Sequence, residues 1–175
     1  MSKKFYTSDF HFFHNNIIRY CNRPFDDVFQ MHDTIVERVN EKVAPNDDLF
    51  ILGDISFYGG DKVINILERM NGKKHFLIGN HDAKNMKNWS GWQSVNHYLE
   101  IKDRGKHIVL CHYPIESWHG QNHGWIHLHG HRHGVEGRYF GRPSESGVRV
   151  DIGVDPWNFY PVELNDLKKR GLLDA

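Results

Sequence analysis

The sequence predicts an α/β fold in which a sandwich of mixed β-sheets is flanked by helices. Strand-like runs alternate with helical segments in the first part of the chain, whereas the second part is mostly strands. A length of 175 residues suits one domain with a substantial core, and no internal repeat or low-complexity linker divides it. We therefore expect residues 1–175 to form a single domain.

In the first half of the chain, each predicted strand is short and is followed by a helix. The expected elements are a strand at Phe5–Ser8, a helix at Asn15–Tyr20, a helix from Asp27 to about Val43, a strand at Leu49–Leu52, a helix from Asp61 to Met70 and a strand at Phe76–Ile78. Asp27 is a suitable N-cap, and apolar residues recur every four positions from Met31 to Val43. The continuous apolar run at Leu49–Leu52 is typical of a strand buried on both faces.

The second half of the chain predicts mostly strands. The expected elements are strands at Val95–Ile101 and His107–Leu110, a histidine-rich strand that begins at Trp125, a loop at Gly137–Gly147, a strand at Val148–Val154 and a helix at Val162–Arg170. The histidine-rich segment reads WIHLHGHRHG, with a histidine at every second position. That period places His127 and His129 on one face of a strand. We interpret them as a polar strand face, with support of neighbouring metal ligands as the alternative.

Composition limits the classes of function. Lys plus Arg and Asp plus Glu both total 22, so the chain has no net basic field for long nucleic acid. Two cysteines are too few for a disulfide framework; a single bridge is an alternative to reduced thiols. The N-terminal segment lacks the apolar region of a signal peptide, and no apolar run approaches the length of a membrane span. We expect a cytoplasmic protein.

Polar side chains follow the apolar runs at the point where each run ends. They are Asp9 and His11, Asp54, Asn80 and His81, His112, and His131 with His133. Open α/β sheets bind their ligands at the carboxyl ends of their strands, so these groups should meet at one edge. Burying them without a partner is costly, and imidazole is a common ligand of transition metals. The pattern predicts a metal site.

In this order the segments resemble the motifs of the calcineurin-like metallophosphoesterases: DxH, GDxxD, GNH[DE], an isolated His, and GHxH. The resemblance extends from Asp9 to His133, and Ser8–Ile18 is similar to the start of short bacterial and phage members. It implies a metallophosphoesterase-like sandwich with two metal ions. It implies that Asp9, His11 and His133 hold one ion, that Asn80, His112 and His131 hold the other, and that Asp54 bridges them. By the same resemblance His81 is catalytic and faces the substrate.

One position departs from the family pattern. Phe57 stands where the second motif usually ends in an Asp that orients the histidine of the third motif. Asp82 and Asp151 are the two candidates for orienting His81 instead, and without such a group the acid strength of His81 is less well set. The departure concerns the acid strength of His81 and leaves the predicted metal ligands intact.

The ligand types point to the metal and the reaction. Imidazole, carboxylate and amide donors suit Mn, Fe, Zn or Ni better than Ca, and the resemblance favours Mn. Two such ions lower the pKa of bound water and stabilise both oxygens of an in-line phosphoryl displacement. His81 would protonate the leaving alkoxide. We expect hydrolysis by a metal-bound hydroxide without a covalent enzyme intermediate.

Four further residues are candidates for substrate contacts. His14 follows His11 closely, and an ordinary place in the first turn of a helix is its alternative. Arg23 can hold phosphate bidentately or be a solvated loop residue. Tyr113 and Trp118 follow His112 and can line the pocket or stack on a base, although Trp118 also suits the core. The remaining histidines look like surface or strand residues: His32, His75, His97 and His107.

These observations favour a metallophosphoesterase acting on a nucleotide or another small phosphodiester. Only 18 residues separate His112 from His131, which leaves little chain for a lid and predicts an open site. The alternatives are a phosphomonoesterase for small molecules or proteins, and a non-catalytic metal-containing binding module. A structural zinc domain does not fit, because such sites are usually Cys-rich and have four ligands. The expected partner is a small phosphorylated substrate, without a membrane or long nucleic acid.

Overall fold

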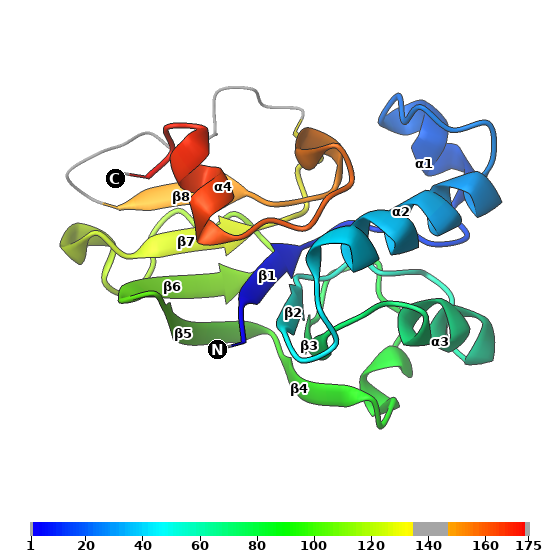
Figure 1. Ribbon diagram of the computed structural model, residues 1–175, viewed down its shortest axis with the longest axis horizontal. Helices are drawn as coiled ribbons and strands as arrows, with labels where there is room; N and C mark the ends of the chain where they lie inside the picture. The colour runs from blue at the N-terminus through cyan, green and yellow to red at the C-terminus, as the bar shows by residue number, and fades with distance from the viewer. Residues whose placement is uncertain (1, 135–146, 174–175) are drawn as a thin grey trace.

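Two four-stranded sheets pack face to face, with helices on the outside of the first sheet (Figure 1). The computed structural model describes residues 2–134 and 147–173, so most of the loop predicted at 137–147 lies outside the described residues. The α/β sandwich predicted from the sequence is confirmed, with one parallel sheet and one mixed sheet.

The first sheet is entirely parallel and runs in the order β1-β2-β3-β4. Its strands are β1 (Lys4–Thr7), β2 (Asp48–Ile51), β3 (Lys73–Leu77) and β4 (Trp92–Asn96). Alternate side chains enter two different cores, because successive residues of a strand face opposite ways. Leu49 and Ile51 face the helices, whereas Phe50 and the following Leu52 face the second sheet. Burial of both faces explains the continuous apolar runs in the sequence.

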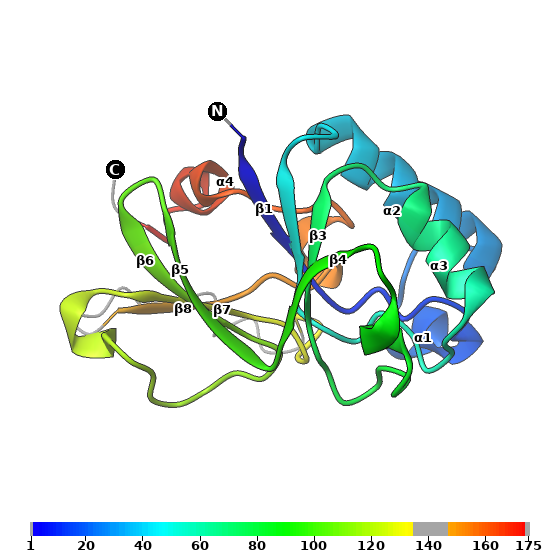
Figure 2. The ribbon, with the colours of Figure 1, turned by 90° about the horizontal axis from the view of Figure 1, so that it is seen from below.

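The outer core lies between the first sheet and its helices (Figure 2). These helices are α1 (Asn15–Tyr20), α2 (Val28–Lys42) and α3 (Asp61–Glu68). The predicted stripe on α2 is buried, and the Asp27 carboxylate accepts hydrogen bonds from the first turn at Phe29 N and Gln30 N, 2.8 and 2.9 Å away. The predicted cap and stripe of this helix are therefore confirmed.

The second sheet runs in the order β5-β6-β7-β8. Its strands are β5 (Tyr98–Asp103), β6 (Lys106–Cys111), β7 (Ile126–His129) and β8 (Val148–Asp151). Only the pair β5–β6 is antiparallel. Apolar residues of both sheets form the inner core, which α4 (Leu164–Lys169) closes at one end through Leu164 and Leu167. Figure 2 shows α4 between the two sheets.

The predicted strand Val95–Ile101 is wrong as a single element. The chain leaves the first sheet after Asn96 and enters the second at Tyr98, so His97 separates two strands of different sheets. The apolar and polar residues continue in one pattern through this crossing, and periodicity therefore gives no sign of it.

His127 and His129 share one face of β7, as the alternation predicts, but this polar face is not open to solvent. Both side chains are buried, because the segment between β6 and β7 covers this face of the sheet. Burial lowers the pKa of His127 to about 3, so its ring is neutral: Nδ1 donates to Val109 O at 3.2 Å, and Nε2 accepts from Ile115 N at 3.1 Å. His32 is likewise buried rather than at the surface, and its Nε2 accepts a 2.9 Å hydrogen bond from Phe13 N.

Two further expectations can be compared with the described residues. Cys21 and Cys111 are both free thiols, so the single bridge that composition left open is absent between them. Within residues 2–134 and 147–173, no helix has the length and apolar character that crossing a bilayer requires.

Candidate metal centre

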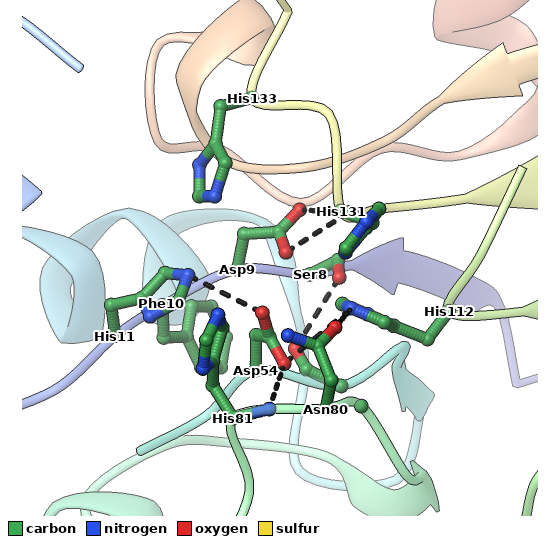
Figure 3. A network of polar contacts seen from close by, with 12 residues as sticks. Ser8, Asp9, Phe10, His11, Asp54, Asn80, His81, His112, His131 and His133 are labelled. Carbon is green, nitrogen blue, oxygen red and sulfur yellow. Dashed lines mark hydrogen bonds and ion pairs between the residues drawn. The ribbon is translucent and has the colours of Figure 1, made fainter. Parts of the chain in front are cut away.

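The predicted ligands come together at the carboxyl ends of strands from both sheets (Figure 3). The loop after β1 runs beside the loop after β2: Asp9 N donates to Gly53 O at 3.0 Å, and His11 N donates to Asp54 O at 2.9 Å. The loop after β7 joins them, since His131 N donates to both carboxylate oxygens of Asp9 at 2.9 and 3.1 Å. Backbone hydrogen bonds thus hold these loops in register.

The backbone at these loops is strained. Five of the predicted ligands have a positive φ, which non-glycine residues rarely adopt: Asp9, His11, Asp54, His131 and His133, with φ from 51° to 73°. Each such residue costs about 1–3 kcal/mol, and strain of this kind concentrates at functional sites. Gly79 allows its loop to approach Asp54 closely, because a Cβ atom there would lie 2.4 Å from Asp54 Oδ1.

The side chains form two groups that could each hold a metal ion. Asp9, His11 and His133 make one group, and Asp54, His112 and His131 make the other, with the potential ligand atoms of each group within 4.8 Å of one another. The Asp54 carboxylate lies between the two: Oδ2 is 3.5 Å from His11 Nε2, and Oδ1 is 3.4 Å from His112 Nε2. Asn80 joins the second group, with Oδ1 3.0 Å from His112 Nε2.

The polar groups here fit a bound cation. Both ring nitrogens of His11 are buried and have no hydrogen-bond partner among the residues that the structure describes. Burial, with the neighbouring charges of His133 and Arg23, lowers the pKa of His11 to about 2, so the ring is neutral and can act as a ligand. Burial raises the pKa of Asp9 well above its usual value. A buried set of imidazole and carboxyl groups of this kind is satisfied most readily by divalent cations.

His133 is held by Asp155, a residue that the sequence did not single out. His133 Nδ1 lies 2.8 Å from Asp155 Oδ2. Burial favours the neutral imidazole, but this hydrogen bond, with Cys21 and the Asp9 carboxylate nearby, raises the pKa of His133 to about 10. The remaining ring nitrogen is left for a metal, the arrangement typical of metal-binding histidines. The only sequence signal was an Asp at the end of the last strand region, followed by Pro.

The structure argues against Arg23 as a phosphate clamp. Its side chain is buried, and its donors are already engaged: Nε and Nη2 bind the Asp155 carboxylate at 2.8 and 2.9 Å, and the other N–H groups point at Asp9 O, Phe10 O and the Met31 sulfur. Arg23 therefore links the loop of Asp9 to Asp155, the residue that binds His133. The sequence could not show this because Asp155 lies 132 residues away.

The hydrogen bonds of both candidates for orienting His81, among the described residues, go to backbone groups and not to its ring. Asp82 accepts hydrogen bonds from three backbone groups, Asp54 N, Ile55 N and Gly79 N, at 2.7–3.0 Å. Asp151 accepts from Gly134 N and Gly153 N. Both carboxylates therefore hold ligand loops.

His81 itself is half-buried and packs against aromatic rings. Its backbone N donates to Asp54 Oδ1 at 2.8 Å, which ties its loop to the metal group. The Phe57 ring lies 4.5 Å from the His81 ring, and the His11 ring lies 5.6 Å away. Among the described residues, no hydrogen bond orients the His81 ring, so its position depends on packing.

The other predicted substrate contacts occupy different places. His14 lies beside the site, with its ring 5.7 Å from the His11 ring, and its Nδ1 is buried without a hydrogen-bond partner in residues 2–134 and 147–173. Tyr113 is exposed and lies 5.0 Å from the His131 ring. Trp118 packs over the second sheet instead: its Nε1 donates to Trp125 O, and its ring lies 5.4 Å from His127. This location favours a role in packing for Trp118 over a contact with the substrate.

Comparison with known proteins identifies a family whose model matches most of the chain. A family model described as calcineurin-like phosphoesterase matches residues 5–156. An uncharacterized protein of Methanocaldococcus jannaschii is 34% identical over 173 residues, which cover 97% of this chain and 91% of that protein.

Solved structures share the fold. A protein of unknown function from Aquifex aeolicus superposes with a TM-score of 0.75 at 22% identity, over 97% of this chain and 100% of that one. An archaeal phosphodiesterase superposes with a TM-score of 0.55 at 14% identity, over 86% of this chain and 82% of that one. At these identities the likeness concerns the fold alone.

Proposed function

The chain belongs to the calcineurin-like phosphoesterase family, and from this premise we propose that it is a metal-dependent phosphodiesterase with two metal ions. The observation that carries the proposal is the position of Asp54. Its two carboxylate oxygens face histidines of two different groups, His11 and His112, at 3.5 and 3.4 Å. A single carboxylate between two such groups is suited to bridging two ions.

In this proposal Asp9, His11 and His133 hold one ion, Asn80, His112 and His131 hold the other, and Asp54 contacts both. When bound, the two ions supply Lewis acidity toward the phosphate oxygens and a water molecule of lowered pKa. The mixed nitrogen and oxygen donors suit Mn, Fe, Zn or Ni, and we favour Mn.

The chain's own residues position the substrate and move a proton. His81 lies beside the Asp54 carboxylate on a half-buried loop, where its ring can donate a proton to the leaving oxygen. His14 has a buried, unpartnered Nδ1 beside His11 and is suited to contact a phosphate oxygen or the group attached to it. Tyr113 stands on the other side of the centre, next to His131.

We favour a small phosphodiester, such as a nucleotide ester, over a phosphomonoester. Exposed aromatic side chains border the site, and one solved structure that shares the fold is an archaeal phosphodiesterase. The balance of 22 basic and 22 acidic residues favours a small substrate over long nucleic acid. A phosphomonoesterase and a non-catalytic metal-binding module are the alternatives. The free thiols of Cys21 and Cys111 agree with a reducing, cytoplasmic location, which we retain as part of the proposal.

The test combines metal content with hydrolysis. Metal-stripped protein is resupplied with Mn, Ni, Zn or Mg singly and assayed on a chromogenic phosphodiester and its monoester, with bound metal counted by mass spectrometry. We expect two ions per chain and faster turnover of the diester. Asp54→Asn should lose metal and activity, whereas His81→Ala should keep its metal and lose about 10²–10⁴-fold in kcat.

Matched controls and contrary outcomes complete this test. Asp26→Asn and His123→Ala remove the same chemical groups from exposed positions and should change neither metal content nor rate. Preference for the monoester would replace the phosphodiesterase with a phosphatase. Retained activity in Asp54→Asn protein that has lost metal would refute the metal mechanism. Two bound ions without turnover of any substrate would favour the binding module.

A further inference from the structure

An aromatic corner stands beside His81 at the rim of the metal centre. Four rings compose it: His11, His14, Phe57 and His81. We propose that this corner binds a planar group on the leaving side of the substrate, so that the enzyme prefers phosphodiesters whose leaving group carries an aromatic base. This inference deepens the proposed function and rests on it.

The rings form a continuous surface from a buried floor to an exposed rim. His11 is almost completely buried, at 2% exposure, whereas Phe57 is 44% exposed. The Phe57 ring lies 5.0 Å from His14 and 4.5 Å from His81, and Tyr20, 70% exposed, extends the surface 6.1 Å beyond His14. A group that enters the metal centre on this side therefore contacts aromatic faces along its path.

Phe57 has no structural need to be exposed at this point. The apolar residues just before it, Leu52 and Ile55, are completely buried, so the chain could place apolar side chains inside the fold. Exposed aromatic side chains that cluster beside a polar site typically mark a binding surface. Aromatic rings bind nucleobases by stacking, whichever base is present.

The position of His81 decides which part of the substrate reaches the corner. A residue that protonates the leaving oxygen must lie beside that oxygen. The group bonded to the leaving oxygen then extends past His81, and the next side chain on this side is Phe57, in contact with the His81 ring. The retained phosphate group faces the metal ligands instead. The aromatic corner consequently contacts the leaving group and selects for its chemistry.

The aromatic corner also contains a polar group that a substrate can contact. Within the described part of the chain, His14 Nδ1 is buried without a hydrogen-bond partner, and the His14 ring stands nearly perpendicular to the Phe57 ring, at 87°. A nucleoside offers both a flat apolar face for Phe57 and polar edges for His14. A purely aliphatic alcohol offers no flat face for Phe57, and at most a polar group for His14.

The experiment uses a dinucleoside monophosphate and two derivatives, each abasic on one side, with the metal-loaded full chain. Product analysis identifies the leaving nucleoside. We expect removal of the leaving-side base to lower kcat/KM about tenfold, and removal of the retained-side base to have a smaller effect. Phe57→Ala should lower kcat/KM about tenfold more for the complete substrate than for the derivative without the leaving-side base. Phe57→Tyr should preserve the discrimination.

Two controls separate stacking from other roles of Phe57. Tyr98→Ala removes an aromatic ring that is 40% exposed on β5, and it should not change the preference between substrates. Phe57→Asp replaces the ring with a carboxylate that can accept a hydrogen bond from His81. If Phe57→Ala slows all three substrates equally and Phe57→Asp restores the rate, the residue acts through His81 and our inference is wrong.

A binding measurement keeps the inference testable if no substrate is hydrolysed. Calorimetry then compares thymidine monophosphate with deoxyribose 5-phosphate on metal-loaded wild type and Phe57→Ala protein. Tighter binding of the nucleotide that Phe57→Ala abolishes would retain the aromatic corner while the hydrolase proposal fails. Equal binding of the two ligands to the wild type would overturn the corner as a base-binding surface.

Discussion

Arg23→Met tests the network that connects the metal ligands. The guanidinium has five N–H donors, and all five have acceptors: two on the Asp155 carboxylate, one each on the carbonyls of Asp9 and Phe10, and one on the Met31 sulfur. Methionine keeps an apolar, unbranched side chain at this position and removes every donor. Asp155 is then left with His133 as its only charged side-chain partner in the described network.

The magnitude follows from burial. The Arg23 side chain has 0% exposure and Asp155 has 9%, so water cannot replace the lost contacts. Removing one partner of a buried ion pair costs about 3–5 kcal/mol, because the other charge stays buried and unpaired. A domain has only about 5–15 kcal/mol of stability in total. We therefore expect Arg23→Met to lose a large part of the free energy of unfolding.

The assay is urea unfolding in the presence of a chelator, followed by the fluorescence of the five tryptophans. Arg69→Met is the matched control: the Arg69–Asp33 pair is shorter, 2.6 Å, but its side chains are 49% and 59% exposed. Exposed pairs of this kind contribute about 0–1 kcal/mol. If Arg23→Met and Arg69→Met lose similar free energies of unfolding, the argument that burial makes the Arg23 network strong is refuted.

Two other predictions concern metal affinity. Because the pKa of His133 is raised to about 10, its ring is protonated on both nitrogens at pH 7 in the metal-free protein. A metal must displace one of these two protons. Affinity at this site should therefore rise about tenfold per pH unit between pH 6 and 8, as measured by competition with a chelator; a flat profile would contradict the raised pKa. Gly79→Ala should weaken metal binding, because its methyl group would lie 2.4 Å from Asp54 Oδ1. Gly105→Ala, whose methyl group meets nothing within 4 Å, should bind metal as wild type does, and equal losses in both variants would refute this steric argument.

Much of the site could be predicted because its signal is local. Strands β1, β2 and β3 of the first sheet are each followed by polar residues, and parallel strands bring their carboxyl ends to one edge of the sheet. This rule predicts that Asp9, Asp54 and Asn80 lie close together, and the structure places them side by side (Figure 3). The strand of His131 belongs to another sheet, yet its end reaches the same centre through hydrogen bonds to Asp9.

The errors have a common physical cause. Alternation predicted that His127 and His129 share a face of β7, but it contains no information on which segment covers that face. Arg23 followed by Pro is typical of an exposed loop, and its burial depends on a carboxylate 132 residues away. The break at His97 depends on which sheet offers a free edge to the strand that follows.

The sequence by itself determined the fold class, most of the helices and strands, and the chemical nature of the site. These features depend on residue type and on spacing along a few turns or strands, which are short-range properties. Only the tertiary structure decided that Asp155 and Arg23 support His133, that Asp82 holds three backbone groups, and that Phe57 packs directly against His81. Such contacts join residues distant in the chain or depend on side-chain direction, so they exist only once both sheets have packed and their loops have been brought together.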